Sequence, residues 1–170
     1  NQTEYTVTQI TDSDYDWGEL AGANNRACEL EDSFDISIYL GEEVPSVIDI
    51  YGLTQETDVS KIDSSLDILE NILRQYPDDF LSELCYGSIK GIRVYLCSDI
   101  SGLSGNSISS ASGFVLTVDN HLVMVLDVNY DYDWTYTINH ELSHMIDKKL
   151  SYISEYNPNC SFSEETWQSY

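Results

Sequence analysis

Residues 138–149 read INHELSHMIDKK, and this stretch carries two of the chain's three histidines, His140 and His144. The two histidines are four positions apart, and Glu141 follows the first of them directly. On an α-helix, side chains four residues apart lie on one face, one above the other, so both imidazoles can point at a single metal ion. The stretch therefore predicts a metal site on a helix, and Zn2+ is the expected metal because imidazole nitrogen is one of its preferred ligands.

The sequence around the histidines has the pattern of an amphipathic helix. Apolar side chains recur at helical spacing on the opposite face, at Ile138, Leu142, Met145 and Ile146. They would pack on a sheet and leave the histidines facing a cleft. Asp133 is available as the N-cap, and Lys148 and Lys149 would complement the negative end of the helix dipole. We expect this helix to span about residues 134–150.

Two acidic residues of the stretch have expected roles beside the metal. Glu141 lies about 100° round the helix from His140, so it can reach a metal-bound water without being a ligand, as a general base does. Asp147 lies on the metal side and can accept a histidine N–H bond, which would fix the ring's orientation from outside the ligand set. A solvated acid near the helix end is the alternative for Asp147. The alternative for the whole stretch is a helix face with two histidines and no metal.

The sequence HELSHMID at residues 140–147 resembles the HExGHxxD helix of certain zinc metallopeptidases. These are similar to the anthrax lethal factor catalytic domain and the Pro-Pro endopeptidases, within the zincin superfamily. The expected order of elements over roughly residues 60–150 is also similar. Ser143 departs from the family pattern, which usually has glycine there, so the packing of this helix on its neighbour is expected to differ.

The resemblance implies an α+β fold: a zincin-like metallopeptidase domain with a small twisted mixed sheet, a backing helix and the HExxH active-site helix. It implies a gluzincin-like zinc metalloendopeptidase, a hydrolase of peptide bonds, with His140 and His144 as metal ligands and Glu141 as the catalytic residue. The expected partner is a peptide or protein substrate. The substrate preference of the family does not carry over, because its specificity residues have no recognisable counterparts here.

A catalytic zinc site normally has three protein ligands and a water, and gluzincin-like enzymes take the third from a glutamate on a later helix. Residues 161–164 (SFSE) resemble a capping box that opens such a helix. Glu164 is therefore one candidate, with Glu165, Glu155 or an aspartate as others. The chain's end lacks a helix stop signal, so we expect a C-terminal truncation and keep a ligand beyond Tyr170 as a further alternative.

Composition limits the class of protein. Thirty acidic and seven basic residues give a net charge of -23, which repels nucleic acid phosphates and excludes nucleic acid as an expected partner. A length of 170 residues with 42% hydrophobic content predicts one domain over residues 1–170, and we expect a monomer. No apolar run reaches the roughly 18 residues of a membrane span. Few lysines, many tyrosines and a first residue other than methionine favour a mature bacterial protein that is extracellular or attached to the cell surface.

The region before the motif predicts a weakly structured segment, a strand and a helix. Residues 1–33 are weakly periodic, so we expect a weakly structured N-terminal segment there. Residues 34–40 (FDISIYL) alternate apolar and polar side chains as a strand does. Apolar positions over residues 66–76 recur at helical spacing, and Asp63 or Ser64 is available as the N-cap of that helix.

Further elements are predicted from local composition. They are an extended piece at residues 44–51, a short helix at 78–84 closed by Gly87, a strand at 92–97, a glycine- and serine-rich loop at 98–113, and a hairpin formed by residues 114–118 and 122–128. One hairpin strand is expected at an exposed edge of the sheet, where an extended peptide can bind by strand addition.

The four cysteines, Cys28, Cys85, Cys97 and Cys160, allow three disulfide pairings. Cys85 and Cys97 would bracket a helix end and a strand end, so a short local bridge between them is predicted. Buried free thiols are the alternative.

Two functions from different classes follow from these patterns. The first is zinc-dependent peptide hydrolysis. The second is a non-catalytic surface binding module on a degenerate zincin scaffold. The intact Glu141 favours the enzyme, whereas the uncertain third ligand favours the binding module.

Overall fold

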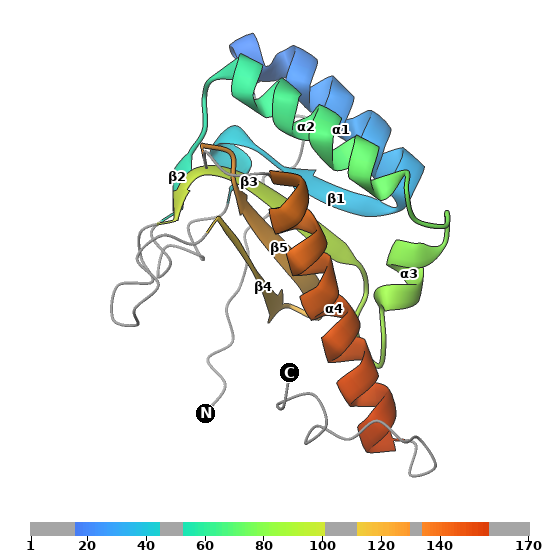
Figure 1. The fold of residues 1–170 in the computed structure, drawn as a ribbon. Coiled ribbons are helices and arrows are strands. Elements are labelled where there is room, and N and C mark those ends of the chain that lie inside the picture. Colours follow the sequence, from blue (N-terminus) through green and yellow to red (C-terminus); the bar gives the residue numbers. More distant parts are fainter. Residues whose placement is uncertain (1–15, 45–52, 101–111, 130–133, 157–170) are drawn as a thin grey trace.

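The computed structural model describes residues 16–44, 53–100, 112–129 and 134–156, and over these it has an α+β fold. Short 3-10 turns lie at Gly18–Leu20 and Gly41–Glu43. The helices and strands follow in the order α1 (Ala21–Phe34), β1 (Ile36–Tyr39), β2 (Leu53–Gln55), α2 (Val59–Leu73), α3 (Phe80–Leu84), β3 (Ile92–Ile100), β4 (Gly113–Val118), β5 (His121–Asp127) and α4 (Trp134–Tyr156) (Figure 1).

The strands form a five-stranded mixed sheet in the order β1-β3-β5-β4. β1, β3 and β5 are parallel, and β4 is antiparallel to β5. Cys97 pairs with Gln55 of β2 and with Asp127 of β5, so β2 extends the sheet on the same side of β3 as β1. No described strand pairs with the outer side of β4, which confirms the predicted edge strand of the hairpin.

The turn between β4 and β5 explains why the hairpin was predictable. Asp119 and Asn120 both have positive φ values, 49° and 59°, as the two central residues of a type I′ turn must. Asp and Asn tolerate this left-handed conformation better than other non-glycine residues. The pair Val118 and His121 closes the hairpin directly beside the turn.

The two faces of the sheet enter different apolar clusters because side chains alternate along each strand. The helix-side cluster takes the even-numbered residues Ile92, Val94, Leu96, Leu122, Met124 and Leu126. α1, α2 and α4 all contribute to this cluster, so the three helices cover one face of the sheet (Figure 1). The other face carries a second cluster formed by Tyr95, Cys97, Ile100, Val123 and Val125.

The prediction that residues 1–33 are weakly structured is wrong where the structure describes them, because α1 occupies Ala21–Phe34. Its buried face consists largely of small side chains, Ala23 and Ala27, followed by Leu30. Small residues give a weak apolar period but let α1 pack closely on α2. Arg26 of α1 also forms an ion pair with Glu70 of α2.

α2 begins earlier than predicted, at Val59, and its N-cap is Asp58. The Asp58 carboxylate accepts hydrogen bonds from the backbone N–H groups of Ser60 at 3.0 Å and Lys61 at 3.4 Å. The predicted caps, Asp63 and Ser64, lie inside the helix. The early turn was missed because the polar residues at its start resemble a loop.

The remaining predicted elements are confirmed with shifted ends. β1, α3 and β3 are present, β3 continues to Ile100, and α4 continues to Tyr156. Gly87 has a positive φ of 55°, but α3 ends earlier, with Cys85 as its C-cap. Residues 45–52 and 101–111, which hold most of the predicted extended piece and loop, lie outside the described residues.

The predicted disulfide between Cys85 and Cys97 is wrong, since both residues are thiols. Cys85 packs against the helix-side cluster, whereas Cys97 belongs to the cluster on the other face of the sheet. The Cys97 thiol donates to the carbonyl oxygen of Leu126 at 3.3 Å, and burial raises its pKa to about 12. The two sulfurs are separated by the sheet itself. Cys160 lies outside the described residues.

Candidate metal centre

α4 brings the two histidines of the motif together. The Nε2 atoms of His140 and His144 are 3.0 Å apart, and the two rings meet edge to face. Two imidazole nitrogens on one tetrahedral zinc lie about 3.3 Å apart, because each Zn–N bond is about 2.0–2.1 Å. The pair therefore fits a shared zinc ion with only a small change in ring position.

The opposite face of α4 explains why the histidines face outward. Ile138, Leu142 and Met145 are all buried in the helix-side cluster, as the sequence pattern predicted. The beginning of α4 is tied to the sheet, because the Trp134 indole N–H donates to the carbonyl oxygen of Asp127 at 2.8 Å. These contacts fix the rotation of the helix about its axis.

The protonation of His144 suits a metal ligand. Partial desolvation lowers the pKa of its imidazole, and the neighbouring His140 lowers it further. A histidine with a lowered pKa is neutral near pH 7 and keeps a lone pair for a metal. His144 can therefore bind a metal without first losing a proton.

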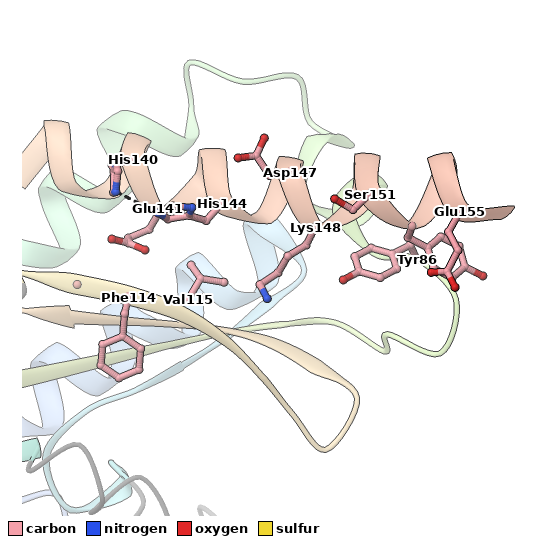
Figure 2. Close-up of a pocket in the computed structure, with 12 residues that line it drawn as sticks. Tyr86, Phe114, Val115, His140, Glu141, His144, Asp147, Lys148, Ser151 and Glu155 are labelled. Atoms are coloured by element: carbon pink, nitrogen blue, oxygen red, sulfur yellow. Dashed lines mark hydrogen bonds between the residues drawn. The ribbon is translucent and has the colours of Figure 1, made fainter. Parts of the chain in front are cut away.

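Glu141 lies beside the histidines but in a different environment. Its side chain is only 4% exposed, and burial raises its pKa to about 7. Its Oε2 atom has no hydrogen-bond partner among the described residues. An unsatisfied buried polar atom costs about 1–3 kcal/mol, so this carboxylate indicates a partner that enters the site from the cleft. Figure 2 shows it extending from α4 toward the strands.

A cleft of about 820 Å3 runs along α4. The helix supplies one wall, and the edge strand β4 supplies the other through Gly113, Phe114 and Val115 (Figure 2). The histidines and Glu141 lie at one end of the cleft. Lys148, Ser151, Tyr152 and Glu155 continue the helical wall away from them, and Tyr86 adds a side wall.

Two contacts that sequence reasoning missed hold α4 next to this cleft. The Tyr76 hydroxyl donates to the Asn139 side chain at 2.7 Å, directly before the first histidine. A Cβ atom at Gly113 would lie 3.0 Å from the Val125 carbonyl oxygen and 3.2 Å from Cγ2 of Thr137. Glycine at this position therefore lets β4 approach α4 closely. The sequence signal for this close approach was a glycine directly before an apolar strand.

The expectation that Lys148 lies at the end of the helix is wrong. α4 continues to Tyr156, so Lys148 lies within the helix and lines the cleft. Lys149 instead donates to the backbone carbonyl of Glu83, which joins α4 to α3. The spacing of four residues from His144 to Lys148 was the signal that could have placed Lys148 on the histidine face.

Asp147 lines the cleft, and its negative charge acts on His144. Within residues 134–156 it makes no hydrogen bond to either histidine, and in Figure 2 it extends away from the strands. Its role as an acceptor for a histidine N–H stays a prediction.

Among the described residues, no third His, Cys, Asp or Glu side chain joins the two histidines in a group that could hold a metal. Glu164 and Glu165 lie outside the described residues. Glu155 is on α4 itself, about 16 Å along the helix axis from His144. A side chain that far along a continuous helix cannot join the histidines on one ion, so Glu155 is excluded.

Over the described residues, none of the helices has the length and apolar character needed to cross a membrane. Comparison of the chain with protein-family models, curated proteins and solved structures found no match.

Proposed function

We propose that this chain is a zinc-dependent metalloendopeptidase domain of the zincin superfamily, of the gluzincin-like kind. One observation carries the proposal. The Nε2 atoms of His140 and His144 converge to 3.0 Å beside the buried Glu141, whose Oε2 atom lacks a partner among the described residues. A small mixed sheet with an antiparallel edge strand beside this helix supports the same proposal.

His140 and His144 would hold the metal through Nε2. Bound zinc would polarise the scissile carbonyl and lower the pKa of the attacking water. Glu141 would accept the proton of that water and return it to the leaving amine. A carboxylate with its pKa raised to about 7 suits both steps, because it can exist in either protonation state near neutral pH.

β4 supplies a place for an extended substrate. Its outer side is unpaired among the described strands, and Phe114 and Val115 line the cleft opposite the histidines. An extended peptide can pair with such an edge through main-chain hydrogen bonds, which do not depend on its sequence. The edge would hold a peptide bond beside Glu141.

The second candidate is a non-catalytic binding module on a degenerate zincin scaffold. The observation in its favour is that the described residues contain no third ligand for the histidine pair. Alanine substitutions of Glu164 and Glu165 test this point. Loss of most of the zinc affinity in either variant would complete the ligand set and favour the enzyme.

Zinc binding tests the metal centre separately from activity. The chain, first freed of metals with a chelator, is dialysed against zinc and its metal content is measured. We expect about one zinc ion per chain, and loss of most of the affinity in His140→Ala and His144→Ala, because each variant removes one ligand.

The third histidine provides the matched control. His121 lies at the hairpin, where its Nδ1 atom is 2.9 Å from the carbonyl oxygen of Asp119. His121→Ala should keep the zinc. A chain that binds no zinc, or that binds it equally well without His140 or His144, would rule out the proposed site.

A further inference from the structure

Beyond the histidines, the cleft wall of α4 carries one cation. His140, His144 and Lys148 follow one another at intervals of four residues, so they share a face of the helix. Lys148 is about 6 Å farther along the helix axis than His144. Figure 2 shows its side chain leaving α4 on the side of β4, so that it extends into the cleft.

Lys148 differs from most other cations of the domain. Lys61, Lys149, Arg26 and Arg74 each form an ion pair with a glutamate. Lys148 forms no ion pair within the described residues, although the chain has 30 acidic residues. It is also half-buried. A cation that faces a cleft without a counter-charge attracts a negatively charged ligand, so this position favours one.

The acids that flank Lys148 along the helix, Asp147 before it and Glu155 after it, do not neutralise it. Asp147 extends away from the strands in Figure 2, and it is not ion-paired with Lys148. Glu155 is about 10 Å farther along the helix axis and exposed. The rings of Tyr86 and Tyr152, whose centroids are 4.9 Å apart, form an apolar wall at this end of the cleft. Such a wall strengthens a charge pair formed beside it.

A peptide held along β4 would bring its own groups to this lysine. Successive residues of an extended chain advance about 3.3 Å, so a group about two residues from the scissile bond lies one helical turn from the histidines. Carboxylates are the anionic groups that a peptide contains. They occur as aspartate and glutamate side chains and as the free C-terminus.

We propose that Lys148 is a specificity-determining residue that binds a carboxylate of the peptide substrate, about two residues from the scissile bond. This proposal rests on the proposed function, because it takes the cleft to be a peptide site. The proposed peptidase is then selective for peptides with an acidic side chain, or a free C-terminus, at that distance.

Affinity selection tests the proposal without requiring turnover. Zinc-loaded full-length chain carrying Glu141→Gln is incubated with a pool of short peptides in which glutamate and glutamine alternate at each position. Retained peptides are read by mass spectrometry. We expect glutamate to be retained about 10-fold over glutamine at one position, and Lys148→Met to bring that ratio to about 1.

Two arms identify the source of the carboxylate, and further variants separate charge from folding. A glutamate preference that is kept in a pool with amidated C-termini identifies a side chain, whereas retention that depends on Lys148, shows no glutamate preference and is lost on amidation identifies the C-terminus. Lys148→Arg should keep the preference, and Lys148→Glu should prefer lysine in a second pool that varies lysine against glutamine. Lys149→Met removes the neighbouring cation that contacts Glu83, so it should leave the ratio unchanged.

The outcomes separate this proposal from the proposed function. Retention of carboxylate peptides that depends on Lys148, together with no cleavage of the same pool by the chain with Glu141 intact, would reject the peptidase and keep the carboxylate site. Retention of carboxylate peptides that is the same with and without Lys148, or no retention of them, would overturn the role of Lys148 even if peptides are cleaved.

Discussion

Burial gives two carboxylates of this domain properties that the exposed acids lack. Glu141 is 4% exposed and has its pKa raised to about 7, whereas Asp127 is 8% exposed and has its pKa raised to about 6. Glu141 faces the cleft, where a proton acceptor is useful to the proposed reaction. Asp127, the last residue of β5, does not line the cleft, so its raised pKa bears on stability rather than on catalysis.

The raised pKa of Asp127 predicts how the free energy of unfolding depends on pH. Burial is the main cause of its increase, and the carboxylates of Asp99 and Glu56 add to it. Since the folded state holds this proton more tightly than the unfolded state, the contribution of Asp127 to the free energy of unfolding falls as pH rises from about 4 to about 6. Asp127 Oδ1 accepts a hydrogen bond from the backbone N–H of Asn129 at 2.8 Å. Asp127→Asn keeps an oxygen for this bond but cannot titrate, so the contribution of this position should not fall over this pH range.

We therefore expect Asp127→Asn to be more stable than the unmodified chain at pH 7, by about 1–3 kcal/mol, and to lose this advantage near pH 4. Urea unfolding at both pH values measures the difference. Asp78→Asn makes the same charge change at an exposed position and should have little effect. An equal advantage at pH 4 and pH 7 would show that the proton on Asp127 is not responsible.

Among the elements, α4 and the hairpin were predictable, because their patterns depend on local spacing. The motif between Ile138 and Ile146 has a clear helical period, and Asp119-Asn120 selects a two-residue turn. α1 was missed because its buried face is built from alanines, which a hydrophobic pattern detects poorly. The position of Gly113 beside Thr137 could not be predicted, since it depends on two elements that meet only in the folded chain.

Some features of the candidate site could likewise be predicted from local sequence, and others could not. The histidines and Glu141 could be predicted because one helix carries all three, and helical geometry fixes their spacing. The burial of Glu141 and the exposure of Lys148 to the cleft depend on where β4 lies, which no local pattern specifies. The false disulfide had the same origin, because sequence proximity does not reveal that a sheet separates Cys85 from Cys97.

The start of α2 gives a prediction at this scale. Asp58 accepts hydrogen bonds from the N–H groups of Ser60 and Lys61, which would otherwise lack partners in the first turn. Asp58→Ala should therefore lower the midpoint of thermal unfolding. Asp63→Ala is the matched control, because Asp63 lies inside the helix and exposed. A larger loss from Asp63→Ala would contradict the assignment of Asp58 as the N-cap.

At the scale of the whole molecule, the layering of the fold creates the cleft. Three helices cover one face of the sheet, and the last of them, α4, crosses next to the edge strand (Figure 1). The histidine face of α4 is left open there because β4 is the last strand in the described sheet. The candidate metal centre therefore lies where an extended chain can reach it from solvent.

The net charge of -23 bears on both proposed ligands of this cleft, the zinc ion and the peptide. A strongly acidic protein attracts zinc and repels acidic peptides at long range. At physiological ionic strength these fields decay over about 8 Å, so a carboxylate already in the cleft would respond mainly to Lys148 and to a metal held by the histidines. The proposed preference for a carboxylate is therefore local and can act against the overall charge.

The most direct test of the central claim, that the histidines and Glu141 form a hydrolytic zinc site, is a comparison of the full chain with its Glu141→Gln variant. Zinc content and cleavage of a peptide pool are measured for both. We predict that the variant keeps its zinc, because Glu141 is not a ligand, and loses cleavage by about 100- to 10,000-fold, because glutamine cannot accept the proton of the attacking water. Near-normal cleavage by the zinc-loaded variant, or no cleavage by the zinc-loaded unmodified chain, would contradict the account.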